Sequence, residues 1–326
     1  MSPDSTPAGG PGQDRRGAAV VVNPSKFDDD DAREEFRRTV TAALTGAGYE
    51  EPLWLETTED DPGRAMTAQA REAGVGLVLA AGGDGTVRMV AAGLGESDIA
   101  LGVLPMGTAN LLARNLDLPQ KLDEALEVAV GEGERRIDLV RISADDGEPD
   151  HFAVMAGIGA DAVVMESANP DLKRVMGSAA YVFSAIQNAD RPPLKAHIVL
   201  DKGRRREDKK IETFDREAVL MLVGNVGYLQ AQIPLIPDAE PDDGRLDVLV
   251  ASPKSQPGRL KLLLEVLFRR HHEDEAFDLL SGRRVEITVD HEEAYELDGD
   301  PIGHCTRLVA EVVPQALTVR VRPTDR

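Results

Sequence analysis

The amino-acid sequence predicts an α/β fold with a parallel-sheet domain at the N-terminus and a β-rich, sandwich-like domain at the C-terminus. Two observations predict this division. Up to about residue 138, short apolar runs alternate with helical segments across short loops, which is the pattern of a parallel sheet covered by helices. From residue 139, strand-like runs separated by turns take over. A chain of 326 residues is long enough for two such domains.

The first domain is expected to span residues 18–138. The β-branched run that opens it ends at Pro24, because proline has no N–H to donate to a sheet. The first helix is expected to end before Gly46 and Gly48. Strands are expected at 18–22, 53–55, 77–81 and 99–104, and helices at 32–44, 62–73, 87–94 and 122–130.

The second domain is expected at 139–309, with residues 310–326 returning to the first domain and residues 1–17 forming a disordered tail. Residues 201–212 read as a charged loop. Helices are expected at 173–186 and 258–275. The second of these either packs on a sheet, which we favour, or lies on a membrane surface. Strands are expected at 138–142, 152–155, 196–200, 219–224, 246–251, 284–289 and 317–321.

Charge and cysteine content narrow the classes of function. The formal net charge of −21 disfavours nucleic acid as a partner, because phosphate is repelled by an acidic surface. The same charge opposes strong attraction to anionic lipid, although a local basic patch would allow peripheral contact. The single cysteine, Cys305, and the lack of an apolar leader in residues 1–17 indicate a cytoplasmic location, with peripheral attachment at the inner membrane face as an option.

The segment GGDGT at residues 82–86 lies between a predicted strand and a predicted helix. Glycines there let backbone N–H groups approach a ligand, and the helix N-terminus behind them favours an anion such as phosphate. Asp84 inside this loop fits a Mg²⁺ held through water, or acceptance of a proton beside the phosphate. The alternative is a tight turn in which Asp84 caps its own helix.

Two further polar segments follow neighbouring strands, namely PMGTAN at 105–110 and Asn23-Pro24-Ser25. Because ligands of open α/β sheets bind at the carboxyl ends of the strands, we expect the three segments to converge on one crevice. The chain contains no Walker A motif. GIGADA at 157–162 fits G-x-G-x-x-A, but it lacks a βαβ unit, so a dinucleotide site there is disfavoured.

GGDGT together with P-x-G-T-x-N-x-x-A-R at 105–114 resembles the diacylglycerol kinase catalytic domain family, which includes bacterial lipid kinases and sphingosine and ceramide kinases. The resemblance continues through NPSK at 23–26, TTEDDPG at 57–63, RRIDL at 135–139, GIGADA, PDAEPDDGRLDV at 237–248 and LDGDPIG at 297–303. It implies an ATP- and Mg²⁺-dependent kinase of lipid metabolism, acting in phospholipid biosynthesis, that phosphorylates a hydroxyl of a diacylglycerol-like or sphingoid lipid.

The resemblance also implies roles for individual residues. Asp84, Asp298 and Asp300 would form the catalytic centre, with Asp298 or Asp300 as the base, and Asp138 would join Asp84 beneath the phosphates. Magnesium would be bound at Asp243 with Glu240, Arg245 and Asp247. The ATP site would comprise Asn23, Pro24, Ser25, Thr58, Gly82, Gly83, Asp84, Gly85, Thr86, Val87, Arg88, Gly107, Thr108 and Asn110.

Two departures from the family keep alternatives open. The family usually has glutamate at the position of Asp300, and it often has a glycine run where this chain has GNVGYLQAQIP at 224–234. One alternative is an NAD kinase-like or other small-molecule kinase with a GGDG loop. Another is a homologue that binds nucleotide or lipid without catalysis. A homodimer formed through edge strands of the β-rich domain is also left open.

Overall fold

A computed structural model describes residues 16–159, 193–203, 207–229, 234–252 and 277–323. The helices expected at 173–186 and 258–275, nearly all of the N-terminal tail, and the end of GIGADA lie outside the described residues. Within the described ranges, no helix combines the length and apolar character needed to cross a bilayer.

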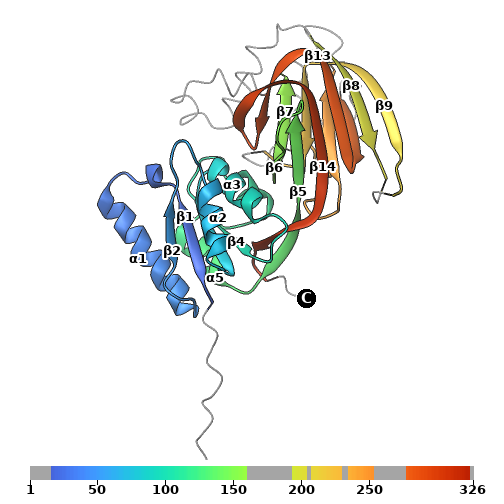
Figure 1. Cartoon of the computed structure of the whole chain (residues 1–326). Coiled ribbons are helices and arrows are strands. Elements are labelled where there is room, and N and C mark those ends of the chain that lie inside the picture. Colours follow the sequence, from blue (N-terminus) through green and yellow to red (C-terminus); the bar gives the residue numbers. More distant parts are fainter. Residues whose placement is uncertain (1–15, 160–192, 204–206, 230–233, 253–276, 324–326) are drawn as a thin grey trace, which may run out of the picture.

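The N-terminal part contains four parallel strands with helices on both faces (Figure 1), and among the described residues these strands continue through β14 (Asp300–Arg320) into a single 14-stranded sheet. The strands run in the order β4-β3-β1-β2. They are β1 (Ala18–Val22), β2 (Leu53–Glu56), β3 (Leu77–Gly82) and β4 (Ala100–Pro105). The helices are α1 (Asp30–Gly46), α2 (Arg64–Glu72), α3 (Asp84–Leu94), α4 (Leu111–Asn115) and α5 (Leu122–Val130), with a short 3₁₀ helix η1 (Pro24–Lys26) after β1.

Alternate residues of β1 enter two different cores. Ala19 and Val21 pack in one layer with α3, and Val20 and Val22 pack in the other with α1. Both faces of β1 and β3 are therefore buried, as a continuous apolar run in a parallel strand predicts.

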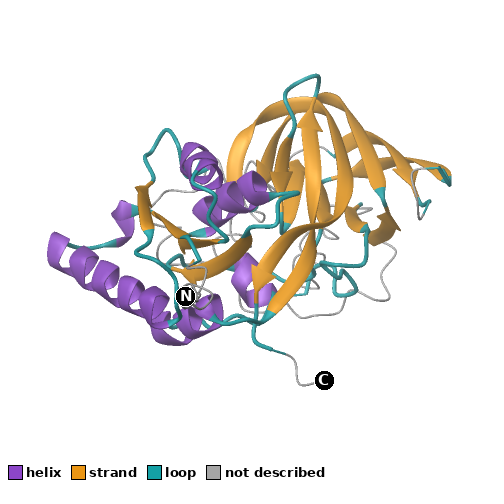
Figure 2. Cartoon of the chain, turned by 60° about the horizontal axis from the view of Figure 1, so that its bottom comes forward, coloured by secondary structure: helices purple, strands orange, loops and turns teal. Residues whose placement is uncertain are grey.

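The C-terminal part is built from antiparallel strands around a third core (Figure 1). The main path runs β12-β11-β10-β7-β13-β14, with β5 and β6 attached to β14 and with β8 and β9 attached to β13. Figure 2 shows the helices gathered on one side of the molecule and this strand-rich part on the other. The strands are β5 (Glu134–Ala144), β6 (Asp150–Phe152), β7 (Met155–Gly159), β8 (Leu194–Asp201), β9 (Ile211–Ala218), β10 (Leu220–Gly224), β11 (Leu246–Ala251), β12 (Phe277–Gly282), β13 (Arg284–Leu297) and β14 (Asp300–Arg320). The predicted fold class is confirmed.

Strand β14 connects the two parts. It pairs antiparallel with β13 and β5, shifts register between Val313 and Leu317, and then pairs parallel with β4 through Thr318 and Val319. The run expected as a separate strand at 317–321 is thus the end of a strand 21 residues long. Strand β14 therefore begins in the β-rich part and ends paired with the parallel strand β4.

The strand expected at 152–155 is wrong. Strand β6 ends at Phe152 and β7 begins at Met155, with Ala153 and Val154 between them. The physical reason is that the N–H groups of Ala153 and Val154 donate to the carboxylate of Asp298 and not to a neighbouring strand.

Candidate active site

The first glycine loop, residues 82–86, and the second glycine loop, residues 105–110, meet at the carboxyl edge of the parallel sheet. The N–H of Met106, after β4, donates to the carbonyl of Gly82, at the end of β3 (2.8 Å). A Cβ placed on Gly107 would lie 2.8 Å from the Cα of Gly83, so a larger residue would force the loops apart. A Cβ on Gly82 would collide with the buried Thr86 at 2.6 Å. The predicted convergence of these segments is therefore built by close backbone packing.

Asp84 joins the second loop to the first. Its two carboxylate oxygens accept hydrogen bonds from the N–H of Leu111 (2.6 Å) and of Asn110 (3.0 Å), at the start of α4. The alternative that Asp84 caps its own helix is wrong, because Gly83 is the N-cap of α3 and Asp84 caps α4. Burial raises the pKa of Asp84, and the nearby Asp300 raises it further.

Asn110 closes the second loop. It adopts a left-handed backbone with φ 48°, and its side chain bonds both the N–H (2.9 Å) and the carbonyl (3.0 Å) of Gly107. The neighbouring Thr108 is exposed at the tip of this loop. Val87, in the first turn of α3, is buried. An aromatic or aliphatic residue in place of Asn110 would lose both loop-closing hydrogen bonds.

The segment after β1 completes the same edge. The N–H of Asn23 donates to the carbonyl of Ala81 (3.0 Å), and its side-chain oxygen accepts from the N–H and the hydroxyl of Ser25 (3.0 and 2.7 Å). Pro24 begins η1. Thr58, in the loop after β2, is exposed, and its hydroxyl accepts from the N–H of Asp61 (3.0 Å). Asn23 and Thr58 therefore shape their own loops through these bonds.

Lys26 was missed by the sequence reasoning. A Cβ placed on Gly83 would lie 3.8 Å from both Cε and Nζ of Lys26, so this exposed ammonium group lies over the first glycine loop. The signal that could have found it is its position in NPSK, two residues after the proline that ends β1. A cation beside exposed glycine backbone suits an anionic ligand.

Asp298 and Asp300 differ in environment although one glycine separates them. The carboxylate of Asp298 is buried and accepts hydrogen bonds from the N–H groups of Ala153 (3.3 Å), Val154 (3.1 Å) and Met155 (2.8 Å). Burial raises its pKa to about 7, although these donors and Arg88 act in the opposite direction. The left-handed backbone at Asp298 and Gly299 (φ 49° and 88°) turns the chain between the two acids.

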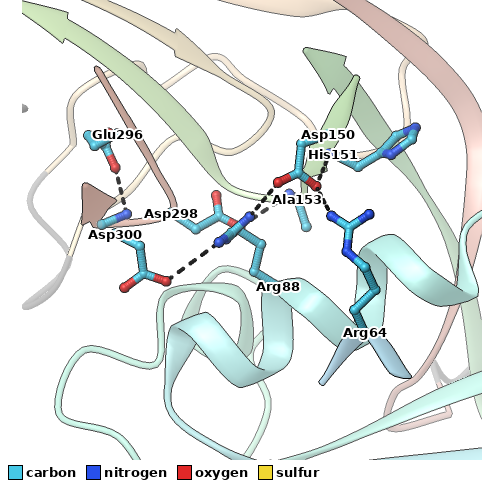
Figure 3. Close-up of polar contacts among 9 residues, drawn as sticks. Arg64, Arg88, Asp150, His151, Ala153, Glu296, Asp298 and Asp300 are labelled. Carbon is cyan, nitrogen blue, oxygen red and sulfur yellow. Dashed lines mark hydrogen bonds and ion pairs between the residues drawn. The ribbon is translucent and has the colours of Figure 1, made fainter. Parts of the chain in front are cut away.

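Asp300 lies where the β-rich part faces the first glycine loop (Figure 3). Its side chain is 47% exposed, and a Cβ placed on Gly85 would lie 2.6 Å from its Oδ2 atom. Of the two acids expected as the base, Asp298 and Asp300, only Asp300 therefore combines access to solvent with contact to the glycine loop.

Arg88, expected at the ATP site, lies between acids of the β-rich part (Figure 3). Its side chain is 6% exposed, donates from Nη1 to Oδ2 of Asp150 (3.1 Å), and forms an ion pair from Nη2 to Oδ2 of Asp300 (3.8 Å). Asp150 and its second partner Arg64 were not singled out from the sequence, because nothing local marks an acid on a short strand as a site residue.

Asp138 does not join Asp84, which corrects the expectation. Its carboxylate accepts from the N–H of Gly244 (2.7 Å) and of Gln315 (2.7 Å), and its own N–H donates to the carbonyl of Pro241 (2.6 Å). It therefore holds the loop 237–248 against the register shift of β14, away from the glycine loops.

The loop expected to bind magnesium contains acids that repel one another. Burial raises the pKa of Asp138 and of Asp247, and the charge of Asp243 raises both further. Asp243 accepts from the N–H of Arg245 (2.9 Å), and the side chain of Arg245 donates to Ser281. Asp242, which accepts from Arg135, raises the pKa of that guanidinium, and Glu240 raises it further. Among the described residues, no three His, Cys, Asp or Glu side chains are arranged to share an ion. Magnesium at Asp243 would thus need backbone carbonyls and water, and it stays a prediction.

Comparison with known proteins identifies the class to which this architecture belongs. Residues 17–142 match the model of the diacylglycerol kinase catalytic domain, and residues 153–321 match that of the YegS C-terminal NAD kinase beta sandwich-like domain. The chain belongs to the diacylglycerol kinase catalytic domain family, as the motifs at 82–86 and 105–114 predicted.

Individual relatives agree. A protein named probable lipid kinase YegS-like from Chromohalobacter salexigens is 31% identical, with 80% of this chain and 81% of that protein covered. A protein named diacylglycerol kinase from Staphylococcus saprophyticus is 28% identical, with 79% and 80% covered. The crystal structure of a putative diacylglycerol kinase from Bacillus anthracis has the same fold, with a TM-score of 0.75 at 24% identity over 95% of this chain and 96% of that one.

Proposed function

We propose that the protein is an ATP- and Mg²⁺-dependent lipid kinase that phosphorylates a hydroxyl of a diacylglycerol-like or sphingoid lipid. The observation that carries this proposal is the contact between Asp300 of the β-rich part and Gly85 of the first glycine loop. The carboxylate of Asp300, a proton acceptor in the β-rich part, thereby faces the first glycine loop, which is of the type that binds phosphate. Membership of a lipid kinase family supports the same reaction class.

The reaction needs positioning and charge neutralisation more than covalent catalysis. The glycine loops and Lys26 would bind the phosphates of ATP, with backbone N–H groups and one cation as ligands. The lipid oxygen would attack the γ-phosphorus, the bond from that phosphorus to the oxygen of the departing ADP would break, and the hydroxyl proton would pass to Asp300. Asp298 is a poor candidate for this base, because its oxygens are buried against three N–H donors.

Magnesium bound with the nucleotide supplies neutralisation of phosphate charge. The residue that would hold it is Asp84, through water. Its carboxylate uses one lone pair of each oxygen for the N–H groups of α4, and it is repelled by Asp300, so a cation nearby would be favourable.

The experiment is transfer of label from γ-labelled ATP to a panel of diacylglycerol, monoacylglycerol, phosphatidylglycerol, sphingosine and ceramide, with NAD⁺ as a water-soluble acceptor. One labelled lipid, lost in Asp300→Asn, supports the proposal and names the acceptor. Label in NAD⁺ alone would overturn the proposed lipid kinase activity in favour of the NAD kinase-like alternative. That alternative is supported by the description of the matched C-terminal model, an NAD kinase beta sandwich-like domain. ATP binding without transfer, unchanged in Asp300→Glu, would indicate a non-catalytic homologue.

A further inference from the structure

The guanidinium of Arg88 holds two carboxylates unequally. Its contact with Asp150 is a hydrogen bond of 3.1 Å, and its contact with Asp300 is a looser ion pair of 3.8 Å. The third nitrogen, Nε, is buried without a hydrogen-bond partner among the described residues. A buried N–H group without a hydrogen-bond partner costs free energy. The guanidinium of Arg88 is therefore held in this orientation by its two carboxylate partners.

Asp150 is the partner that fixes this orientation. It begins β6, and it receives Arg88 of α3 on Oδ2 and Arg64 of α2 on Oδ1 (3.3 Å). Oδ1 also accepts from the N–H of His151 (2.8 Å), which restrains the rotation of the carboxylate. Figure 3 shows Asp150 and Asp300 on opposite sides of the Arg88 head group.

We propose that Asp150 and Arg88 form a positioning pair for Asp300, in which Asp150 holds the guanidinium back so that Asp300 stays oriented beside Gly85 and able to accept a proton. The inference rests on the proposed function, since it assigns Asp300 as the base. Both members act through Asp300 and need no contact with either substrate.

The physical reason is that the strength of the pairing between an arginine and a neighbouring carboxylate sets how readily that carboxylate accepts a proton. A close, bidentate pair with Asp300 would stabilise the carboxylate and make it a weaker base, because arginine and carboxylate fit as two forks. Without a cation, Asp300 would be left beside the carboxylate of Asp84, and this repulsion would favour protonation of Asp300. Because Nη1 of Arg88 is hydrogen-bonded to Asp150, Arg88 pairs with Asp300 at an intermediate strength, through Nη2 alone.

The kinetic test compares Arg88→Met and Asp150→Asn with the wild type over a range of pH. In Arg88→Met the acid limb of the plot of kcat against pH should move to higher pH by roughly one unit, because the cation that stabilises the Asp300 carboxylate is removed. In Asp150→Asn the limb should move to lower pH, because the freed guanidinium pairs fully with Asp300. Both variants should lose about tenfold in kcat, with KM for ATP unchanged.

Arg64→Gln is the matched control. It removes an ion pair from the same carboxylate of Asp150, but Arg64 is 66% exposed. An exposed pair is worth little, so neither kcat nor the limb should change. Asp150→Asn preserves shape, so the test survives if Arg88→Met fails to fold. Melting temperatures of all variants separate loss of folded protein from loss of rate.

A second readout is independent of kinase activity. Asp300→Cys introduces a thiol into a chain whose own cysteine, Cys305, is buried and has its pKa raised by burial to about 12. The pH dependence of alkylation then reports the titration of the introduced thiol. Its midpoint should rise when Arg88→Met is added and fall when Asp150→Asn is added.

Opposite shifts in both readouts support the positioning pair. Unchanged midpoints, or shifts in the same direction for both variants, would overturn it. If the wild type transfers no phosphate to any lipid, the proposed function fails, and the thiol titration still decides whether Asp150 and Arg88 set the properties of position 300.

Discussion

Asp84 and Leu111 lie 27 residues apart and are joined by a hydrogen bond of 2.6 Å, in which the N–H of Leu111 donates to Oδ1 of Asp84. The bond makes an acid of the first glycine loop the cap of the helix that follows the second. It explains why an acid in an anion-binding loop is tolerated: its charge is directed at helix N–H groups, which favour a negative partner.

Asp84→Ala should therefore abolish phosphate transfer and also lower stability, by roughly 1–2 kcal/mol for a lost cap. Transfer of label from γ-labelled ATP measures the first effect, and thermal melting measures the second. Asp29→Ala is the control, because Asp29 caps α1 through the N–H of Ala32 (2.8 Å) away from the glycine loops, so only stability should fall. Full activity in Asp84→Ala would refute the role given to this carboxylate.

Gly85→Ala should lower kcat by at least about tenfold, because the added methyl group would displace Asp300 from a site where small misplacements are costly. The fold should be retained, since the added methyl group would meet the partly exposed side chain of Asp300 and not the backbone. Gly46→Ala provides the comparison, as nothing lies within 4 Å of a Cβ there. Equal rates in the two variants would argue that Asp300 does not act beside Gly85.

Lys26→Met should weaken ATP binding by about tenfold and reduce its sensitivity to salt, because a cation over the glycine loop attracts phosphate. Titration with nucleotide at two ionic strengths measures this. Lys121→Met removes a lysine that is 83% exposed at the N-cap of α5 and pairs with Glu124, and it should leave ATP affinity unchanged. Wild-type affinity in Lys26→Met would exclude this lysine from the phosphate site.

Asp298 should make stability depend on pH. Its pKa is raised from 3.8 to about 7 in the folded chain, so the folded state binds the proton more tightly. The stability that comes from this protonated carboxyl is present at low pH and is lost as the pH rises through about 7. Asp298→Asn carries no such charge. Melting curves from pH 5 to pH 8 should favour the variant increasingly over the wild type, by a few degrees. A constant difference across this range would contradict the raised pKa of Asp298.

The magnesium prediction at Asp243 is tested by melting temperature. Mg²⁺ should raise the melting temperature of the wild type, because a cation would relieve repulsion among Asp138, Asp243 and Asp247, and it should not do so in Asp243→Ala. Asp98→Ala removes a fully exposed acid elsewhere and should respond like the wild type. No response to Mg²⁺ in the wild type would end the expectation of a metal in this loop.

Features with a local signal could be read before the structure. Buried apolar strands followed by glycine turns and helices specify their own geometry over about ten residues, so the fold class and the convergence of the loops at 82–86 and 105–110 were predictable. The boundary at 152–155 was not. The N–H groups of Ala153 and Val154 donate to a carboxylate distant in sequence, that of Asp298, and not to a neighbouring strand. The alternation of apolar residues in this segment does not indicate such a partner.

Local patterns in the sequence therefore determined the fold class and the candidate phosphate-binding loops. Contacts between segments distant in sequence decided the burial and the partners of each acidic and basic side chain. Asp298 and Asp300 are equivalent in a motif, and only the left-handed turn between them buries one and exposes the other. Asp138 and Arg88 likewise take their partners from strands far along the chain. The physical reason is that burial and charge pairing depend on the packing of segments distant in sequence, and no periodicity of a single segment records which partner it will meet.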